Sequence, residues 1–308
     1  MAATAVVFAY HDVGARCLPV LLAHGVEVPL VVTHRDDPKE NIWFASVENL
    51  ARGRGLAVDT PDDPNAGAFV ERMRAIAPDF LFSFYYRHML SPAVLATARR
   101  GAYNMHGSLL PKYRGRVPVN WAIIHGEHET GATLHYMSEK PDAGDIVAQA
   151  AVPILADETA CQVFDKVTHA AAAMLDQVLP GLVAGTAPRT AQDLRQGSYF
   201  GGRKAEDGRI DWLQPARRIH DLVRAVAPPY PGAFTDVGGY RLAILRTRVL
   251  DDDSRHAGVP RLVVEGERII AQCVPGTLQI LHCALDGEAA TAAGLIRTLG
   301  AVVPLLNR

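Results

Sequence analysis

The chain has 308 residues, of which 49% are hydrophobic and 21% charged, as in an ordinary globular protein with a sizeable core. This composition excludes global disorder, and the length suggests two domains of roughly 150 residues each. The 31 Lys and Arg against 33 Asp and Glu give a net charge of −2, and residues 200–308 hold 14 basic and 12 acidic residues. Neither the chain nor its C-terminal part has the basic excess of a dedicated nucleic-acid binder.

The cysteines and the N-terminus bear on metal content and location. The four cysteines are scattered and form no CxxC pair: Cys17, Cys161, Cys273 and Cys283. Such scatter argues against a zinc site or a disulfide framework, so we expect no metal and the reduced thiols of a cytoplasmic protein. The first residues lack a basic signal-peptide segment, and no apolar run reaches the roughly 18 residues of a membrane span. We therefore expect no membrane insertion.

Short apolar runs alternate with helical patterns through the first half of the chain. We predict strands at residues 5–10, 28–33, 55–58, 79–84, 102–105, 132–137 and 145–152. We predict helices at residues 15–23, 42–52, 66–77, 92–99 and 159–182. This alternation is typical of a doubly wound α/β fold with a mostly parallel, Rossmann-like sheet. The first strand–helix turn, residues 8–14, lacks the GxGxxG glycines that let a dinucleotide approach, so we expect no NAD.

The composition changes after the long helix. Residues 185–204 contain Gly, Pro, Thr and Ser without periodicity, which indicates a linker. An amphipathic helix at 215–227 and short alternating runs separated by turn residues follow, as expected of a small antiparallel, OB-like β-barrel. We predict a catalytic domain at 1–190, a linker at 191–204 and a C-terminal domain at 205–308.

The densest group of polar residues follows the strand predicted at 102–105. Asn104 and His106 are two positions apart, so on an extended strand end both side chains point the same way. Open α/β sheets bind their ligands at this end of the strands. An amide can stabilise a developing oxyanion, and an imidazole can move the proton of an attacking amine, which are the two needs of acyl-type transfer. Asp142 lies on a tight downstream loop, where a carboxylate near the imidazole would orient it and favour its charged form.

These residues belong to a longer motif. The run Asn-x-His-x-Ser-Leu-Leu-Pro at 104–111, with Asp142 36 positions after His106, resembles the 10-formyltetrahydrofolate-dependent formyltransferases. Further similar segments are residues 8–12, 82–87, 114–121, 126–135, 200–203 and 230–234. The resemblance covers almost the whole chain. It is greatest to the formyltransferase domain of the bifunctional polymyxin-resistance enzymes, which N-formylates UDP-4-amino-4-deoxy-L-arabinose.

The resemblance implies roles for particular residues. Asn104 would stabilise the transition state, His106 would be the general acid and base, and Asp142 would tune the pKa of His106. The co-substrate 10-formyltetrahydrofolate would be bound by His88, Met89, Leu90, Arg116, Ser138, Glu139, Lys140, Pro141 and Asp142. Arg203 is the candidate for the acceptor phosphates, because a guanidinium matches phosphate geometry. Histidines without a matching pattern are interpreted as structural or surface residues: His11, His24, His34, His125, His128 and His135.

We therefore predict transfer of a formyl group to the 4-amine of a UDP-linked aminosugar, as in lipid A modification. The alternative is methionyl-tRNA formyltransferase, which shares the motif and the two-domain plan; the low charge of residues 200–308 is poor for binding tRNA phosphates. A non-catalytic folate- or nucleotide-binding module is disfavoured, because all three catalytic positions are intact. The 308 residues hold no second, NAD-dependent decarboxylase half, so we expect a separate decarboxylase in the pathway. A homo-oligomer stays open.

Overall fold

The computed structural model describes residues 2–254 and 259–305. The chain forms two compact units, each built from more than one segment. The first unit comprises Met1–Pro118, Glu129–Val152 and Phe164–Gly201. The second comprises Val119–His128, Pro153–Val163 and Gly202–Arg308.

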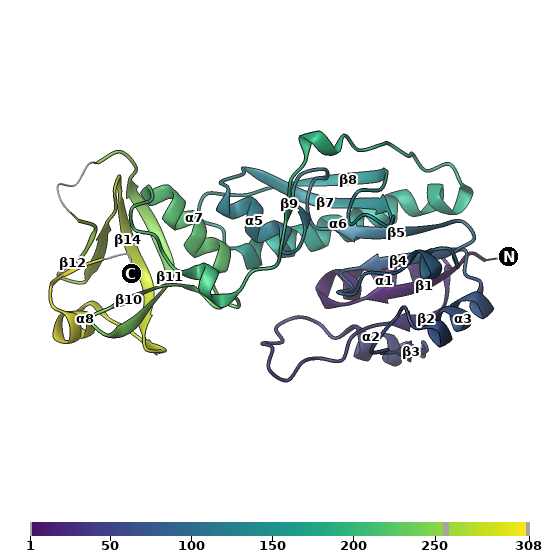
Figure 1. Ribbon diagram of the computed structural model, residues 1–308, viewed down its shortest axis with the longest axis horizontal. Helices are drawn as coiled ribbons and strands as arrows, with labels where there is room; N and C mark the ends of the chain where they lie inside the picture. Colours follow the sequence, from purple (N-terminus) through teal and green to yellow (C-terminus); the bar gives the residue numbers. More distant parts are fainter. Residues whose placement is uncertain (1, 255–258, 306–308) are drawn as a thin grey trace. The chain divides into compact units, whose positions relative to one another are not determined.

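The first unit is built on a seven-stranded sheet with the order β3-β2-β1-β4-β5-β7-β8 (Figure 1). Its strands are β1 (Thr4–Ala9), β2 (Glu27–Val32), β3 (Val58–Asp59), β4 (Phe80–Phe84), β5 (Gly101–His106), β7 (Glu129–Tyr136) and β8 (Ile146–Pro153). The pairs from β3 to β5 are parallel, and β7 runs antiparallel to β5. The central parallel strands are buried on both faces, which explains their unbroken apolar sequences. The predicted α/β fold with a mostly parallel sheet is confirmed.

Helices cover both faces of this sheet. On one face, α1 (His11–Ala23) lies beside α6 (Ala160–Ala184), and the ion pairs Arg16–Asp165 and His24–Asp176 join them. On the other face, α3 (Gly67–Ile76) and α4 (Pro92–Leu95) pack through Phe69, Met73 and Val94 on side chains of β1 and β2, Phe8 and Leu30 among them. The chain therefore buries its core in two layers around the sheet.

Helix α6 is long and apolar enough to cross a membrane by length and composition alone. Its buried residues recur at spacings of three and four: Val163, Val167, Ala171, Leu175, Leu179 and Leu182. A single buried stripe of this kind is the pattern of a helix that packs on a globular core.

Several predicted helices and strands begin or end elsewhere. Helix α2 spans Val47–Gly53 rather than starting at residue 42, because Ser46 caps it by accepting a hydrogen bond from the Asn49 amide at 3.2 Å. Residues 33–46 are instead a long loop between β2 and α2. The helix predicted at 92–99 is the single turn α4, and β3 starts at Val58 rather than at residue 55. Helices α5 (Pro118–Ile124) and α8 (Ala292–Leu299) were not predicted.

The second unit is an antiparallel half-barrel. Its main path is β10-β11-β14-β13-β12-β16, and β15 (Glu288–Ala289) pairs with β14. The strands are β10 (Ala233–Val237), β11 (Tyr240–Asp251), β12 (Arg261–Glu265), β13 (Arg268–Gln272), β14 (Thr277–Leu285) and β16 (Val302–Pro304). Helix α7 (Ala216–Val226) buries Ile219 and Val223 in the same core as Trp212 and Leu242. The predicted antiparallel C-terminal domain is confirmed.

The strand order of the first unit defines where a ligand can bind. The chain builds outward from β1 to β2 and β3 on one side, then to β4 and β5 on the other. Ligands of open α/β sheets bind at the carboxyl ends of strands, beside the point where this direction reverses. The loops after β1, β2, β4 and β5 all leave from that edge.

Candidate active site

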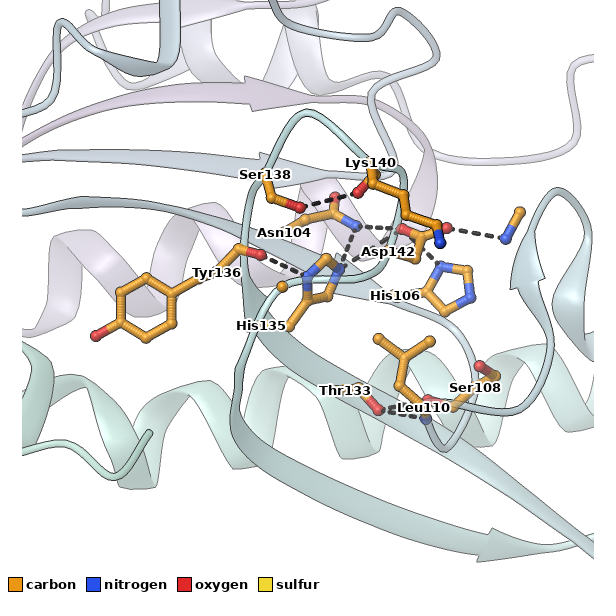
Figure 2. Close-up of polar contacts among 12 residues, drawn as sticks. Asn104, His106, Ser108, Leu110, Thr133, His135, Tyr136, Ser138, Lys140 and Asp142 are labelled. Atoms are coloured by element: carbon orange, nitrogen blue, oxygen red, sulfur yellow. Dashed lines mark hydrogen bonds and ion pairs between the residues drawn. The ribbon is translucent and has the colours of Figure 1, made fainter. Parts of the chain in front are cut away.

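Asn104 is positioned by its antiparallel neighbour. The β5–β7 register places Asn104 directly opposite His135, so both side chains lie on the same face of the sheet. Nδ1 of His135 donates to the carbonyl oxygen of Tyr136 at 2.8 Å, which leaves Nε2 as an acceptor. The Asn104 amide donates to this Nε2 at 3.1 Å (Figure 2). His135 therefore fixes the orientation of the Asn104 amide.

His106 ends β5 and is buried. Its Nε2 lies 2.8 Å from the carbonyl oxygen of Tyr113, which can only accept, so the resting imidazole carries its proton on Nε2. Nδ1 faces Oδ1 of Asp142 at 3.6 Å. Burial lowers the pKa of His106 below its ordinary value, and the Asp142 carboxylate opposes that shift. The site thus presents a neutral imidazole whose Nδ1 can take up a proton beside a carboxylate.

Asp142 is held as an anion. Its Oδ2 accepts a hydrogen bond from the Gly115 amide at 2.9 Å, and its Oδ1 accepts one from Asn104 at 3.4 Å. Burial alone would raise the pKa of Asp142, but the interaction with His106 and the hydrogen bond from the Gly115 amide outweigh it and hold the pKa well below its usual range. Asp142 also adopts a φ of 50°, a strained value for a residue with a side chain. Its geometry is therefore imposed by the surroundings.

The loop that carries Asp142 is supported from residues that composition assigned to a linker. The Gln192 amide donates to the carbonyl oxygens of Asp142 at 3.1 Å and Gly144 at 2.5 Å. Arg189 pairs with Asp145 at 2.6 Å. Within the first unit, residues 189–192 thus run along the Asp142 loop and hold its backbone.

Gly144 lies where the Asp142 loop touches the end of β7. A Cβ built on Gly144 would lie 1.9 Å from the Tyr136 carbonyl oxygen, a backbone atom that cannot swing away. We expect Gly144→Ala to displace the loop, lower the melting temperature by several degrees and lower kcat about tenfold or more. Thermal unfolding and turnover measure both.

Gly201→Ala is the matched control, because nothing lies within 4 Å of the position that its Cβ would take. It should behave like the wild type. Equal behaviour of the two variants would contradict the close approach at Gly144.

The chain after His106 is locked by buried polar contacts. The Thr133 hydroxyl donates to the Ser108 carbonyl oxygen at 2.6 Å and accepts from the Leu110 amide at 3.1 Å. Gln149 donates to the Leu110 carbonyl oxygen at 2.8 Å, and the Ser108 hydroxyl donates to that of Lys112 at 2.7 Å. These bonds fix the turn that brings the Tyr113 carbonyl to within 2.8 Å of Nε2 of His106.

The residues predicted for the donor lie on three segments of the first unit. After β4, Leu90 is buried, Met89 is 55% exposed and the exposed His88 ring lies 4.8 Å from the His34 ring. Arg116 has an exposed side chain, and its amide donates to the Phe200 carbonyl oxygen at 2.9 Å. Ser138, Glu139, Lys140 and Pro141 lead from β7 into Asp142, and the Ser138 hydroxyl donates to the Lys140 carbonyl oxygen at 2.9 Å.

Arg203 belongs to the second unit. Its guanidinium stacks 4.8 Å over the Trp121 ring and donates to the Asp207 carbonyl oxygen at 2.7 Å. Arg203 is therefore held in place by neighbours of its own unit.

His135 and Gln192 are among the residues of the site that were not predicted. His135 was interpreted as structural, yet it contacts Asn104 and lies 3.6 Å from Asp142. Gln192 fell in the predicted linker. His135 lies just before the loop that carries Asp142, which pointed to a role at the site. To place it beside Asn104, however, one must know that its strand pairs antiparallel with β5 and in which register.

The sequence matches two family descriptions. Residues 22–179 match "Formyl transferase", and residues 203–299 match "Formyl transferase, C-terminal domain". The first match covers half of the chain, so the protein belongs to the formyl transferase family. It is a formyltransferase.

Solved structures share the fold over both units. An N-formyltransferase from Helicobacter canadensis, in complex with folinic acid and dTDP-3-aminofucose, is 18% identical with a TM-score of 0.71, over 91% of this chain and 99% of that one. WlaRD, a sugar 3N-formyltransferase in the presence of dTDP and 5-N-formyl-tetrahydrofolate, is 16% identical with a TM-score of 0.70. The match covers 94% of this chain and 98% of that one. HypX from Aquifex aeolicus with tetrahydrofolic acid is 18% identical with a TM-score of 0.61, over 96% of this chain and 47% of that one.

Proposed function

We propose that the protein transfers the formyl group of 10-formyltetrahydrofolate to the amine of a nucleotide-linked aminosugar. The observation that carries this proposal is the convergence of Asn104, His106 and Asp142 at the carboxyl end of β5. The Helicobacter and WlaRD structures, which hold formylated folates together with dTDP or a dTDP-aminosugar, support the same two substrate classes.

The donor residues suit a folate. Met89 offers exposed apolar surface and is followed by buried Leu90, which suits the apolar faces of the folate ring system. Residues 138–141 precede the carboxylate of Asp142 directly in the chain and present backbone groups to the donor. We propose that His88–Leu90, Arg116 and residues 138–142 hold the donor. The donor supplies the activated one-carbon unit, and the protein supplies orientation and charge.

His106 would transfer the proton during the reaction, and Asp142 would stabilise the protonated imidazole. As the acceptor amine attacks, Nδ1 of His106 takes the proton, because Nε2 already holds one against Tyr113. The resulting imidazolium lies 3.6 Å from the Asp142 carboxylate, which stabilises it. The proton can then pass to the departing nitrogen of the donor.

Asn104 would stabilise the charge that develops on the formyl oxygen. Its amide makes a 3.1 Å bond to His135 and a longer, 3.4 Å bond to Asp142. The longer bond is the one that a substrate oxygen can replace at low cost. His135 meanwhile keeps the amide oriented, which is the preorganisation that makes such a donor effective.

For the acceptor we propose UDP-4-amino-4-deoxy-L-arabinose, with Arg203 at its phosphates, in lipid A modification and polymyxin resistance. The whole-chain sequence resemblance supports this choice. A separate decarboxylase would then act in the pathway that makes this aminosugar. The transfer reaction would take place in the cytoplasm and would need no membrane insertion. Methionyl-tRNA is the alternative acceptor, disfavoured by the low charge of residues 200–308.

The test is release of tetrahydrofolate from 10-formyltetrahydrofolate with each acceptor offered in parallel. We expect turnover with UDP-4-amino-4-deoxy-L-arabinose and none with Met-tRNA. Turnover with dTDP-linked aminosugars alone would replace UDP by dTDP as the nucleotide of the proposed acceptor. Turnover with Met-tRNA alone would overturn the proposed acceptor class. Folate binding without turnover on any amine would favour a binding module.

The charge state of Asp142 predicts a pH-dependent stability. Because its pKa is lower in the folded chain than the ordinary 3.8, the anion stabilises the fold at neutral pH, and that contribution is lost as the pH falls below 3.8. Asp142→Asn should therefore melt several degrees below the wild type at pH 7, with a smaller difference near pH 3. Thermal unfolding at both pH values measures this, and a constant difference would contradict it.

A further inference from the structure

The long loop at residues 33–46 is hydrogen-bonded to the segment after β4 through Arg87. The loop leaves β2 and returns to α2 (Figure 1). The two guanidinium nitrogens of Arg87 donate to the two carboxylate oxygens of Glu40 at 2.7 and 2.6 Å. The backbone amide of Arg87 donates to Nε2 of His34 at 2.9 Å. Side chain and main chain of one residue thus bind both halves of the loop.

Neighbouring contacts fix the geometry of this joint. The Arg87 guanidinium also lies 4.7 Å over the Tyr10 ring, and the Tyr10 hydroxyl donates to Asp36 of the loop at 2.7 Å. A bidentate pair stacked on an aromatic ring allows one orientation of the guanidinium. The Arg87 and Glu40 side chains are 47% and 32% exposed, so solvent weakens the pair without abolishing it.

The same loop packs on the residues that flank Arg87. The His34 ring stacks on Tyr86 at 4.1 Å and meets the His88 ring edge-on at 4.8 Å. At its other end, Phe44 stacks on His11 at 3.9 Å. The loop therefore holds the main chain from residue 86 to residue 88 from one side.

We propose that Arg87 is a positioning residue that couples the order of residues 33–46 to the affinity for the formyl donor. The proposal rests on the proposed function, in which His88–Leu90 hold that donor. Arg87 precedes His88 directly, so the bonds to Glu40 and His34 set the course of the chain into the donor segment before the donor arrives. A segment ordered in advance loses less freedom on binding, which raises affinity.

The test uses Glu40→Gln, which keeps the shape of the side chain and removes its charge, and Arg87→Lys, which keeps the charge and removes the fork. Folinic acid, a stable formylated folate, is the probe. We expect its Kd and the donor KM to rise about three- to tenfold in both variants, with kcat at saturating substrates within about twofold. Trypsin cleavage after Arg35 or Lys39, both on the loop, should accelerate by a similar factor.

Two further variants make the test specific. The reversed pair Glu40→Arg with Arg87→Glu should recover part of the affinity, since it restores opposite charges. Glu71→Gln is the matched control: it breaks the exposed pair with Arg74 within α3, outside the loop, and should change nothing.

The outcomes separate this proposal from the proposed function. If the wild type binds folinic acid and both variants bind it equally well, the coupling is overturned. A fall in kcat at unchanged Kd also overturns it. A wild type that does not bind folinic acid overturns the proposed donor, while unchanged trypsin rates in the variants overturn the tie between Arg87 and the loop.

Discussion

Replacement of His106 by alanine is expected to lower kcat about 10²- to 10⁴-fold at saturating donor and acceptor. The reason lies in the two ring nitrogens: Nε2 is occupied by the Tyr113 carbonyl, and Nδ1 faces Asp142 at 3.6 Å. Without the imidazole, the part of the chain that the structure describes offers no other neutral base between these two groups. Turnover of purified variants measures the loss.

A second substitution separates chemistry from folding. His106→Ala removes the 2.8 Å hydrogen bond from the imidazole to the Tyr113 carbonyl oxygen, which the Ser108 hydroxyl also approaches at 3.4 Å. The loss costs about 0.5–1.5 kcal/mol and lowers the melting temperature. His106→Gln can still donate to that carbonyl but cannot carry a proton, so we expect near-normal melting with the same loss of kcat. His169→Ala, at an exposed histidine of α6, is the control and should keep full activity. Near-wild-type turnover of His106→Gln would remove His106 from the proposed mechanism.

The pH dependence of the wild type follows from the same residue. A base must be neutral to accept a proton, so the rate falls as the pH drops through its pKa. Because burial lowers the pKa of His106, the plateau of kcat should extend below pH 6.5, the ordinary histidine value.

The sheet could be predicted because its information is local. Parallel strands buried on both faces give short apolar runs, and the helices between them give the alternation that predicts an α/β fold. The direction of β7 is different. A strand has the same pattern in either direction, so nothing local showed that β7 pairs antiparallel with β5 and brings His135 opposite Asn104.

The loops show the same limit. Residues 42–46 have a helical pattern, yet Trp43 and Phe44 pack on the His11 ring at 4.8 and 3.9 Å, and α2 starts only after Ser46. Gln192 was assigned to a linker because its segment shows no hydrophobic periodicity of a helix or strand. Its role depends on two backbone carbonyls nearly fifty positions earlier, which no local pattern contains.

Several non-glycine residues of the first unit adopt a positive φ. Asp142, Tyr113, Val117, Tyr85 and His11 are non-glycine residues with φ between 48° and 62°, all in the first unit. Each such conformation costs free energy and persists only where surrounding contacts impose it. Two of these residues contact the candidate catalytic side chains: Asp142 accepts a hydrogen bond from Asn104 at 3.4 Å, and the Tyr113 carbonyl oxygen accepts one from His106 at 2.8 Å.

Asn104→Ala is expected to lower kcat about 10²- to 10³-fold, the usual cost of removing one oxyanion donor. The Asn104 amide is directed by His135 and is shared with Asp142 at 3.4 Å. In the proposed mechanism it acts on charge that exists only during the reaction. Binding of folinic acid, which carries no such charge, should therefore change less than about twofold.

The measurement compares kcat with the Kd of folinic acid in the same preparations. Asn49→Ala, at an exposed asparagine of α2, is the control and should match the wild type in both. If Asn104→Ala weakens folinic acid binding and leaves kcat intact, Asn104 is a donor-binding residue and the developing charge is stabilised elsewhere. If kcat alone falls, the Asn104 amide acts where the charge develops, and His135 acts through it by holding that amide in place.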